Sequence, residues 1–455
     1  MGRLEHTTKI TRRAAVGVFA AAGAGFAIFG PRAPKYSGGS RVVIDYWEKW
    51  TGHEGAAMER VVHRFNESQD RIHVRYFSMN GIGQKALIAI AGGDPPDVIG
   101  LWNFSIPAYS EAGALLALDE LVTEHGITKE KYAAPVWQLL THRGKLWGLV
   151  NTCGSVALYY NKTLFREAGL DPEKPPRTID ELDACHASLT TKNASGEYER
   201  VGFLHTEPGW WSWPWGYFFG GTLYDSVSDT AVAASPANIA GYEWVQSYPR
   251  TYGASALIKF QSGLGVYGTA QHPFLAGKVA MTIQGPWLVN NIQEFKPTLD
   301  YGVTPMPVAA SLYDPAQPIG LLDSDVLVIP RGAKHPAESM EFIAYTQRQE
   351  IVEELSLAHC KNSPLASISE EFVAKHPHKY LYVHDAITRS PRAFCFPRTR
   401  TWPEYEKDFN SAMQRMWRVS EPAAATLAQV QERAQVQLDR AADQRARRAA
   451  RRGQS

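Results

Sequence analysis

The chain has 455 residues, of which 44% are hydrophobic and 20% are charged, a composition that excludes a wholly disordered protein. Its only long apolar run lies near the N-terminus, which excludes a polytopic membrane protein. Four cysteines in so long a chain exclude a disulfide-rich scaffold, while the 13 tryptophans require a role.

The charge is divided unevenly along the chain, although the formal net charge is only +1. Residues 1–40 hold six basic side chains and one acidic one, and residues 440–455 hold six arginines and one aspartate. Of the 47 basic and 46 acidic residues, the body between these ends therefore keeps 35 and 44, a net charge near −9. Nucleic-acid binding needs a basic face that neutralises phosphates, so this acidic body predicts no nucleic-acid partner.

The N-terminus predicts an export signal over residues 1–35. Arg12 and Arg13 precede a run of small and apolar residues at 14–29. A charged segment followed by an apolar run is typical of secretory signals, and the paired arginines indicate the twin-arginine route. The run is short for a membrane span, and an uncleaved N-terminal anchor is the alternative. The predicted location is periplasmic or otherwise extracytoplasmic.

Residues 41–113 alternate between predicted strands and predicted helices. Sequence patterns predict strands at 41–47, 71–77 and 97–102 and helices at 55–66, 83–91 and 106–113. Strands separated by helices form a mostly parallel α/β sheet, in which ligands bind at the carboxyl ends of the strands. The side chains predicted at those ends are Trp50, Thr51, His53, Asn80, Trp102 and Asn103.

A second unit of strands and helices begins near residue 151. We predict a strand at 156–160 and helices at 162–168 and 178–189. Thr178 and Glu181 have the spacing of a capping box at the start of the third element. The tail, residues 423–452, is rich in Ala, Gln and Arg and predicts a helix, whose last arginines are expected in solvent.

The densest aromatic stretch covers residues 207–219 and holds four tryptophans within six positions. Pyranose rings have apolar C–H faces and polar edges, so aromatic planes suit the faces while carboxylates and amides suit the hydroxyls. The stretch therefore predicts a sugar-binding segment, and an aromatic satellite of the core is the alternative.

Several segments, in order along the chain, resemble family 1 extracellular solute-binding proteins, the substrate-capturing components of ABC importers that include maltose-binding protein. They are residues 92–102 (GGDPPDVIGLW), 109–115 (YSEAGAL), 157–162 (ALYYNK), 274–287 (FLAGKVAMTIQGPW), 301–307 (YGVTPMP) and 326–330 (VLVIP). No single motif is decisive, and the order and spacing carry the resemblance, which covers about residues 41–415.

The resemblance implies an α/β, two-lobed periplasmic-binding-protein fold with hinge strands crossing between the lobes. One lobe would comprise residues 41–150 plus 326–350, and the other residues 151–325 plus 351–455. The ligand would bind between the lobes, which close around it by hinge motion for the permease to recognise. The implied partners are a sugar or oligosaccharide and the transmembrane subunits of an ABC permease, and the protein is expected to be a monomer without a cofactor.

The resemblance also implies ligand-binding residues, where this chain matches the family pattern. They are the aromatic Trp102, the Glu-Pro-aromatic group Glu207, Pro208, Trp210 and Trp211, the stacking Trp287, Trp402 near the final helices, the strand-end residues Trp50, Thr51 and His53, and, with less support, Asp323. Arg398 would suit an anionic sugar or a phosphate ester. Gly154 stands where maltose-binding protein has an acidic residue, which argues against a maltodextrin ligand.

A secreted carbohydrate-active enzyme is the alternative function. Such an enzyme needs two carboxyl groups on either side of the scissile bond, and Glu207 with Asp323 is the pair that could supply them. A glycine pattern at residues 263–268 matches G-x-G-x-x-G but lacks the acidic residue and the strand–helix context of a dinucleotide site. The sequence therefore favours a binding protein without catalytic residues.

Overall fold

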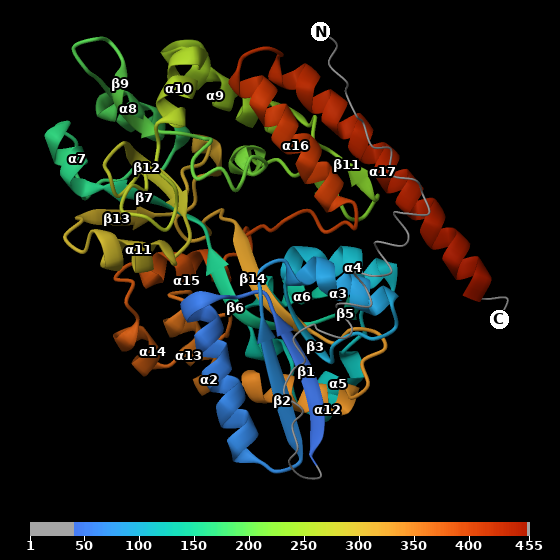
Figure 1. Ribbon diagram of the computed structural model, residues 1–455. Helices are drawn as coiled ribbons and strands as arrows, with labels where there is room; N and C mark the ends of the chain where they lie inside the picture. The colour runs from blue at the N-terminus through green and yellow to red at the C-terminus, as the bar shows by residue number, and fades with distance from the viewer. Residues whose placement is uncertain (1–40, 453–455) are drawn as a thin grey trace, which may run out of the picture. The chain divides into compact units, whose positions relative to one another are not determined.

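The computed structural model describes residues 41–452, and Figure 1 shows its helices and strands. The elements below belong to one compact unit that begins at Val42. The predicted export signal lies outside the described residues. Within residues 41–452, no helix combines the length and the apolar character that crossing a membrane requires.

The first sheet contains the predicted N-terminal strands. Its order is β2 (Ile72–Ser78), β1 (Val42–Glu48), β3 (Val98–Trp102), β14 (Leu322–Val328) and β6 (Leu149–Ser155). β1 pairs in parallel with both β2 and β3, as the alternation of strands and helices predicts. β14 pairs antiparallel with β3 and β6, so a strand from late in the chain lies in the middle of the sheet.

Helices cover the first sheet and form one hydrophobic core with it, which we call the first core. These helices are α2 (Gly52–Ser68), α3 (Ile82–Ala91), α4 (Ile106–Ala112), α5 (Asp119–Glu124), α6 (Ala134–Leu140), α12 (Pro336–Thr346) and α13 (Gln349–Ala358). The predicted helices at 55–66, 83–91 and 106–113 are confirmed in this group. Gly113 ends α4 in the left-handed conformation that glycine adopts without strain. Ile351, Val352 and Leu355 also belong to the first core.

The second sheet has the order β13 (Tyr301–Thr304), β7 (Ala157–Asn161), β12 (Val279–Gln284), β9 (Tyr198–Phe203) and β8 (Thr191–Lys192). Its directions are mixed, because β7 is antiparallel to β12 and β13 whereas β12 is parallel to β9. The main helices around it are α7 (Lys162–Glu167), α8 (Ile179–Leu189), α9 (Pro236–Tyr252), α10 (Ala254–Ser262), α11 (Leu288–Phe295), α15 (Leu381–Arg389), α16 (Trp402–Trp417) and α17 (Ala423–Arg452). Thr178 and Glu181 form the predicted capping box of α8.

Short elements fill the connections. They are the hairpins β4 (Thr141–His142) with β5 (Lys145–Leu146) and β10 (Tyr224–Asp225) with β11 (Thr230–Ala231), the helix α14 (Glu370–Lys375), and the 3₁₀ turns η1 (Asn103–Ser105), η2 (Lys129–Lys131), η3 (Trp215–Phe219) and η4 (Ala310–Leu312).

Two of the segments that carry the chain between the sheets are neighbours. β6 of the first sheet leads into β7 of the second with only Val156 between them. The Val156 amide donates to the Leu321 carbonyl at 2.9 Å, immediately before β14, and Leu322 is paired with Ser155. These paired crossings are the hinge strands that the family resemblance implies, and Figure 1 shows β6 and β14 side by side where they approach the second sheet.

The tryptophan-rich stretch lies mainly in the core, which corrects part of the sequence interpretation. Trp213 and Trp215 are fully buried, and so is Trp402. The rings of Trp213 and Trp402 pack edge to face, with centroids 5.4 Å apart. Trp402 is thus a core residue at the start of α16 and is not available to a ligand.

The sequence predicts that the last arginines of α17 lie in solvent, but Arg445 forms ion pairs. Arg445 pairs with Glu111 of α4 at 3.0 Å and with Asp229 of the β10–β11 turn. Arg143, between β4 and β5, pairs with the same two carboxylates at 3.0 and 3.2 Å. We call Glu111, Arg143, Asp229 and Arg445 the tail cluster. It ties the C-terminal helix to α4, a helix of the first core (Figure 1).

Candidate functional site

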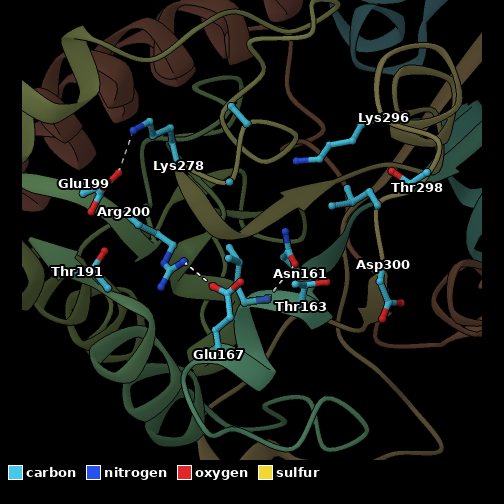
Figure 2. Close-up of a pocket in the computed structure, with 14 residues that line it drawn as sticks. Asn161, Thr163, Glu167, Thr191, Glu199, Arg200, Lys278, Lys296, Thr298 and Asp300 are labelled. Carbon is cyan, nitrogen blue, oxygen red and sulfur yellow. Dashed lines mark hydrogen bonds and ion pairs between the residues drawn. The ribbon is translucent and has the colours of Figure 1, made fainter.

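Two of the hollows among the described residues are similar in size and differ in chemistry. The first, of about 570 Å³, lies where β7 ends and β12 begins, and Figure 2 shows its polar and charged side chains. Its basic groups are already engaged: Arg200 pairs with Glu167 at 3.3 Å, Lys278 donates to the Glu199 carbonyl, and Lys296 donates to the Leu275 carbonyl. No aromatic ring lines this hollow within the described residues, so it offers no surface for a sugar face.

The second hollow, of about 540 Å³, is lined by rings. We call it the aromatic cavity; its aromatic members are Trp50, Trp102, Phe104, Trp210, Trp211, Tyr267, Trp287 and Phe396. Trp102 and Trp210 remain 44% and 42% exposed, although both are large and apolar. Exposed rings grouped around a concave space are typical of a ligand site.

Strand ends from both sheets position the main rings. Trp50 follows β1, Trp102 ends β3, and Trp287 follows β12 in the second sheet. Phe104 stacks on Trp102 with centroids 5.7 Å apart and planes 10° from parallel. On the other side of the cavity, Trp210 packs edge to face on Tyr267 at 4.9 Å. The cavity therefore lies between the carboxyl ends of the first-sheet strands and the aromatic loops of the second half.

Two glycines give Trp287 its position. A Cβ atom at Gly154 would lie 2.7 Å from the Trp287 ring, and one at Gly285 would lie 2.3 Å from it. Both distances are shorter than any normal contact, so only glycine leaves room for the ring. The Trp287 indole N–H donates to the Gln284 side chain at 3.1 Å and fixes the ring orientation. Gly154, the departure from maltose-binding protein noted in the sequence, thus accommodates a cavity ring.

A buried ion network forms the base of the aromatic cavity. Lys361 and Lys49 contact the two oxygens of Asp325 at 2.5 and 2.8 Å, and Lys49 also contacts Glu48 at 3.4 Å. The Thr152 hydroxyl donates to Asp325 at 2.7 Å. Burial alone would raise the pKa of Asp325, but the two ammonium groups hold it well below its ordinary range. We call Glu48, Lys49, Asp325 and Lys361 the floor cluster.

The floor cluster also supports the rings. The Lys49 ammonium lies 4.6 Å from the Trp50 ring centroid and 5.3 Å from that of Trp102. The Lys361 ammonium lies 5.5 Å from Trp50 and 5.9 Å from Trp287. Cations at these distances are attracted to the ring faces, so the two lysines help to fix three rings of the cavity.

Two carboxyl groups of the lining form no ion pair within the described residues. Burial, together with the charge of Asp325, raises the pKa of Asp323 to about 7. Burial also raises the pKa of Glu406, on α16, to about 7. Neither group forms an ion pair within residues 41–452, and Asp323 Oδ1 is buried without a hydrogen-bond partner. Both can accept hydrogen bonds from a ligand in the cavity.

The structure brings half of the sequence-predicted site residues together. Seven of them line the aromatic cavity: Trp50, His53, Trp102, Trp210, Trp211, Trp287 and Asp323. The others do not line it: Thr51, Asn80, Asn103, Glu207, Pro208, Arg398 and Trp402.

The residues that do not line the cavity lie in different surroundings. Thr51 and Asn80 are exposed beyond the strand ends, and buried Asn103 accepts a hydrogen bond from the Ser324 amide at 3.3 Å. Glu207 and Pro208 precede Trp210 but lie outside the lining, although burial raises the pKa of Glu207 to about 7. Partly buried Arg398 has its pKa lowered by burial. Because Glu207 is outside the cavity, the enzyme alternative lacks its carboxyl pair.

Several lining residues were not predicted from the sequence, although the spacing of some of them relative to predicted site residues could have identified them. Asn290 and Asn291 follow Trp287 by three and four positions, which places them on the same side of α11. Tyr267 lies within the G-x-G-x-x-G pattern at residues 263–268, which does not form a dinucleotide site. Glu54, Phe104, Lys361, Phe396 and Glu406 come from segments that no local pattern connected with the site.

The fold and the aromatic cavity define a two-lobed α/β binding protein whose candidate site lies between two sheets joined by paired crossing strands. The model of the bacterial extracellular solute-binding protein family matches residues 49–351, and the chain belongs to this family. It is a family of substrate-binding proteins rather than enzymes, and the comparisons give the enzyme alternative no support. Within residues 41–452, no group of three or more His, Cys, Asp or Glu residues could hold a metal ion.

Relatives and solved structures agree with this assignment. A maltotriose-binding protein of Pyrococcus abyssi is 23% identical over 279 residues, which are 59% of this chain and 54% of that protein. An sn-glycerol-3-phosphate-binding periplasmic protein of Yersinia pestis is 25% identical over 177 residues, or 37% of this chain and 38% of the relative. The match to the structure of CpMnBP1 with mannobiose bound covers 87% of this chain and 100% of the CpMnBP1 chain, with a TM-score of 0.74 and 27% identity.

Proposed function

We propose that this protein is the sugar-capturing component of an ABC importer and that an oligosaccharide binds in the aromatic cavity. One observation carries the proposal: exposed tryptophans from both sides face a single concave space that also holds unpaired carboxyl groups. Rings cover the apolar faces of a pyranose, and carboxyl groups accept from its hydroxyls. The similarity to a mannobiose-bound structure at 27% identity supports a short oligosaccharide.

The rest of the proposal follows from the same class of protein. The lobes, divided as the sequence analysis gives them, would close over the sugar by rotation about the paired crossings at residues 155–157 and 321–322. The closed form would then dock on the transmembrane subunits of the permease as a monomer. Export by a twin-arginine signal over residues 1–35, cleaved or kept as an anchor, would place the protein outside the cytoplasm.

Calorimetric titration of the protein with mannobiose, mannotriose and maltotriose tests the proposal. We expect saturable binding of at least one of these sugars without turnover. Trp287→Ala should weaken the binding, whereas Trp137→Ala should leave the affinity unchanged because Trp137 packs against Tyr132 outside the cavity. Binding of none of the three sugars, or equal affinity in the Trp287 variant, would contradict the proposal.

A further inference from the structure

The charges that line the aromatic cavity do not balance. Four carboxyl groups face it, from Glu54, Asp323, Asp325 and Glu406. Within the described residues, Lys361 is the only lysine in the lining, and no arginine lines it. His53, the other basic side chain of the lining, lies exposed in the first turn of α2.

The one lysine is already neutralised. Lys361 contacts Asp325 at 2.5 Å, and Lys49 contacts the other oxygen of Asp325 at 2.8 Å and Glu48 at 3.4 Å. The floor cluster therefore contains two ammonium groups and two carboxylates, and its formal charges cancel. It has no cation left for a negatively charged ligand.

Three carboxyl groups of the lining have no lysine or arginine within ion-pair distance among the described residues, and Glu54 and Asp323 share the more distant charge of Lys361 with Asp325. Asp323 and Glu406 form no ion pair within the described residues, and Asp323 Oδ1 is buried without a hydrogen-bond partner. The basic group nearest to Glu54 is His359, whose Nδ1 is 3.9 Å away. Burial lowers the pKa of His359 to about 3, so this imidazole is neutral at ordinary pH. The cavity thus carries an excess of negative charge against its aromatic walls.

We propose that the aromatic cavity selects its sugar by charge, with Asp323 and Glu406 as the selecting residues. It binds uncharged oligosaccharides, binds sugars with a basic amine at least as tightly, and rejects sugars that carry a phosphate or a carboxylate. This inference rests on the proposed function and adds the chemical class of the ligand. It runs against the anionic ligand that Arg398 suggested in the sequence, because Arg398 does not line the cavity.

The physical basis is electrostatic. An anion placed in the cavity would meet unpaired carboxylates in a partly dehydrated space, where like charges repel more strongly than in water. An ammonium group would gain an ion pair with Asp323 or Glu406 and would also be attracted to the tryptophan faces. A neutral sugar offers hydroxyl donors to the same oxygens without repulsion.

Three β-1,4-linked disaccharides test the inference: mannobiose, mannobiose with an aminoethyl group on its reducing end, whose alkylammonium stays protonated at pH 8, and the dimer of mannuronic acid. Calorimetry at pH 8 keeps Asp323 and Glu406 ionised, since burial raises the pKa of each only to about 7. We expect the acidic dimer to bind at least about tenfold more weakly than mannobiose, and the basic dimer to bind at least as tightly.

Matched variants assign the effect to its residues. The double variant Asp323→Asn with Glu406→Gln should bring the affinities of the acidic and neutral dimers closer together. Glu404→Gln removes one carboxylate from an exposed position of α16, two residues before Glu406, and should leave their ratio unchanged. The thermal unfolding of each variant shows whether it is folded.

The outcomes are distinct. Acidic and neutral dimers of equal affinity in the unaltered protein, or an unchanged ratio in the double variant, would overturn the charge selection and leave the proposed function standing. Tight binding of the acidic dimer alone would also overturn it. Absence of binding by all three dimers and by mannotriose and maltotriose would remove the proposed function, and the charge selection with it.

Discussion

The floor cluster and the tail cluster join the same kinds of charged groups in opposite surroundings. The side chains of the floor cluster are between 0% and 11% exposed. In the tail cluster only Glu111 is comparably buried, while Arg143 and Arg445 are 43% and 24% exposed. Water and salt reach one network and not the other, so the two should respond differently to mutation, pH and ionic strength.

The comparison shows that similar ion pairs can serve different purposes. Pairs buried together contribute little net stability, but losing one partner leaves an uncompensated charge in a place that water cannot reach. The floor cluster therefore maintains the geometry of the cavity rings above it. The tail cluster secures α17 to α4 by contacts that solvent weakens, and each of its members has more than one partner.

The largest effect is expected at the centre of the floor cluster. Asp325→Ala leaves Lys49 and Lys361 buried without their shared carboxylate, which should lower the free energy of unfolding by about 3–5 kcal/mol. Urea unfolding followed by circular dichroism measures it. A loss below about 1 kcal/mol would show that solvent already reaches these lysines and would erase the contrast between the clusters.

The second effect concerns the ring that rests on the floor cluster. Gly154→Ala adds a Cβ atom 2.7 Å from the Trp287 ring and forces the ring to move. We expect sugar affinity to fall by about 1–3 kcal/mol, comparable to the loss of one stacking ring, without any change of net charge. Ala276→Ser, a small change outside the cavity, is the control and should leave the sugar affinity unchanged. Unchanged affinity in the Gly154 variant would mean that Trp287 does not contact the ligand.

A third prediction separates the two regions by pH. Burial opposes ionisation of Glu111, but hydrogen bonds from His142 and Arg143 and the charge of Arg445 lower its pKa to about 2. Its folded-state pKa is below the unfolded value, so its stabilisation is present above about pH 4.5 and is lost as the pH falls towards 2. Glu111→Gln should therefore reduce stability at pH 7 and have little effect near pH 2.

The pKa of the cavity carboxyl Asp323 is shifted in the opposite direction to that of Glu111. The pKa of Asp323 is raised to about 7 by burial and by Asp325, against the opposing charges of Lys361 and Lys49. Because the pKa is higher in the folded state, protonation of Asp323 favours folding. This contribution to the free energy of unfolding is complete below about pH 4, the unfolded pKa, and is lost as the pH rises to about 7. Asp323→Asn should flatten the stability profile between pH 4 and 7, measured by urea unfolding without sugar. An unaltered profile would contradict the burial of this carboxyl group.

The smallest effect is expected in the tail cluster. Arg445→Ala leaves Arg143 in contact with both Glu111 and Asp229, so it should cost less than about 1 kcal/mol. The loss should shrink further in 1 M salt, where charges are screened within about 3 Å. Unfolding at low and high salt measures this, with exposed Arg447→Ala as the matched control. A large loss of unfolding free energy that does not depend on salt would show that the tail cluster is shielded from solvent like the floor cluster.

Much of the fold was predictable because it follows from local patterns. The alternation of apolar runs and turns locates the strands and helices of residues 41–113, and strand ends locate Trp50, Trp102 and, by the family motif, Trp287. The insertion of β14 between β3 and β6 was not predictable in this way, because its partners lie more than 150 residues earlier in the chain. The residue pattern of a strand does not show which distant strand it will pair with.

The errors at the site have similar causes. Trp402 was assigned to the ligand from a motif, yet Trp402, Tyr405, Phe409 and Met413 repeat at helical spacing and form the buried face of α16. Glu406 adjoins that stripe and reaches the cavity instead. Lys361 was missed because a lysine in a loop carries no local sign that Asp325 lies beside it.

A crystal structure with a bound oligosaccharide, mannobiose first, tests the central claim most directly. We expect sugar rings between Trp102, Trp210 and Trp287, with hydroxyls on Asp323 or Glu406 and no direct contact to Trp402. Sugar bound in the polar hollow of Figure 2, or in the aromatic cavity without stacking on any of those three rings, would contradict it.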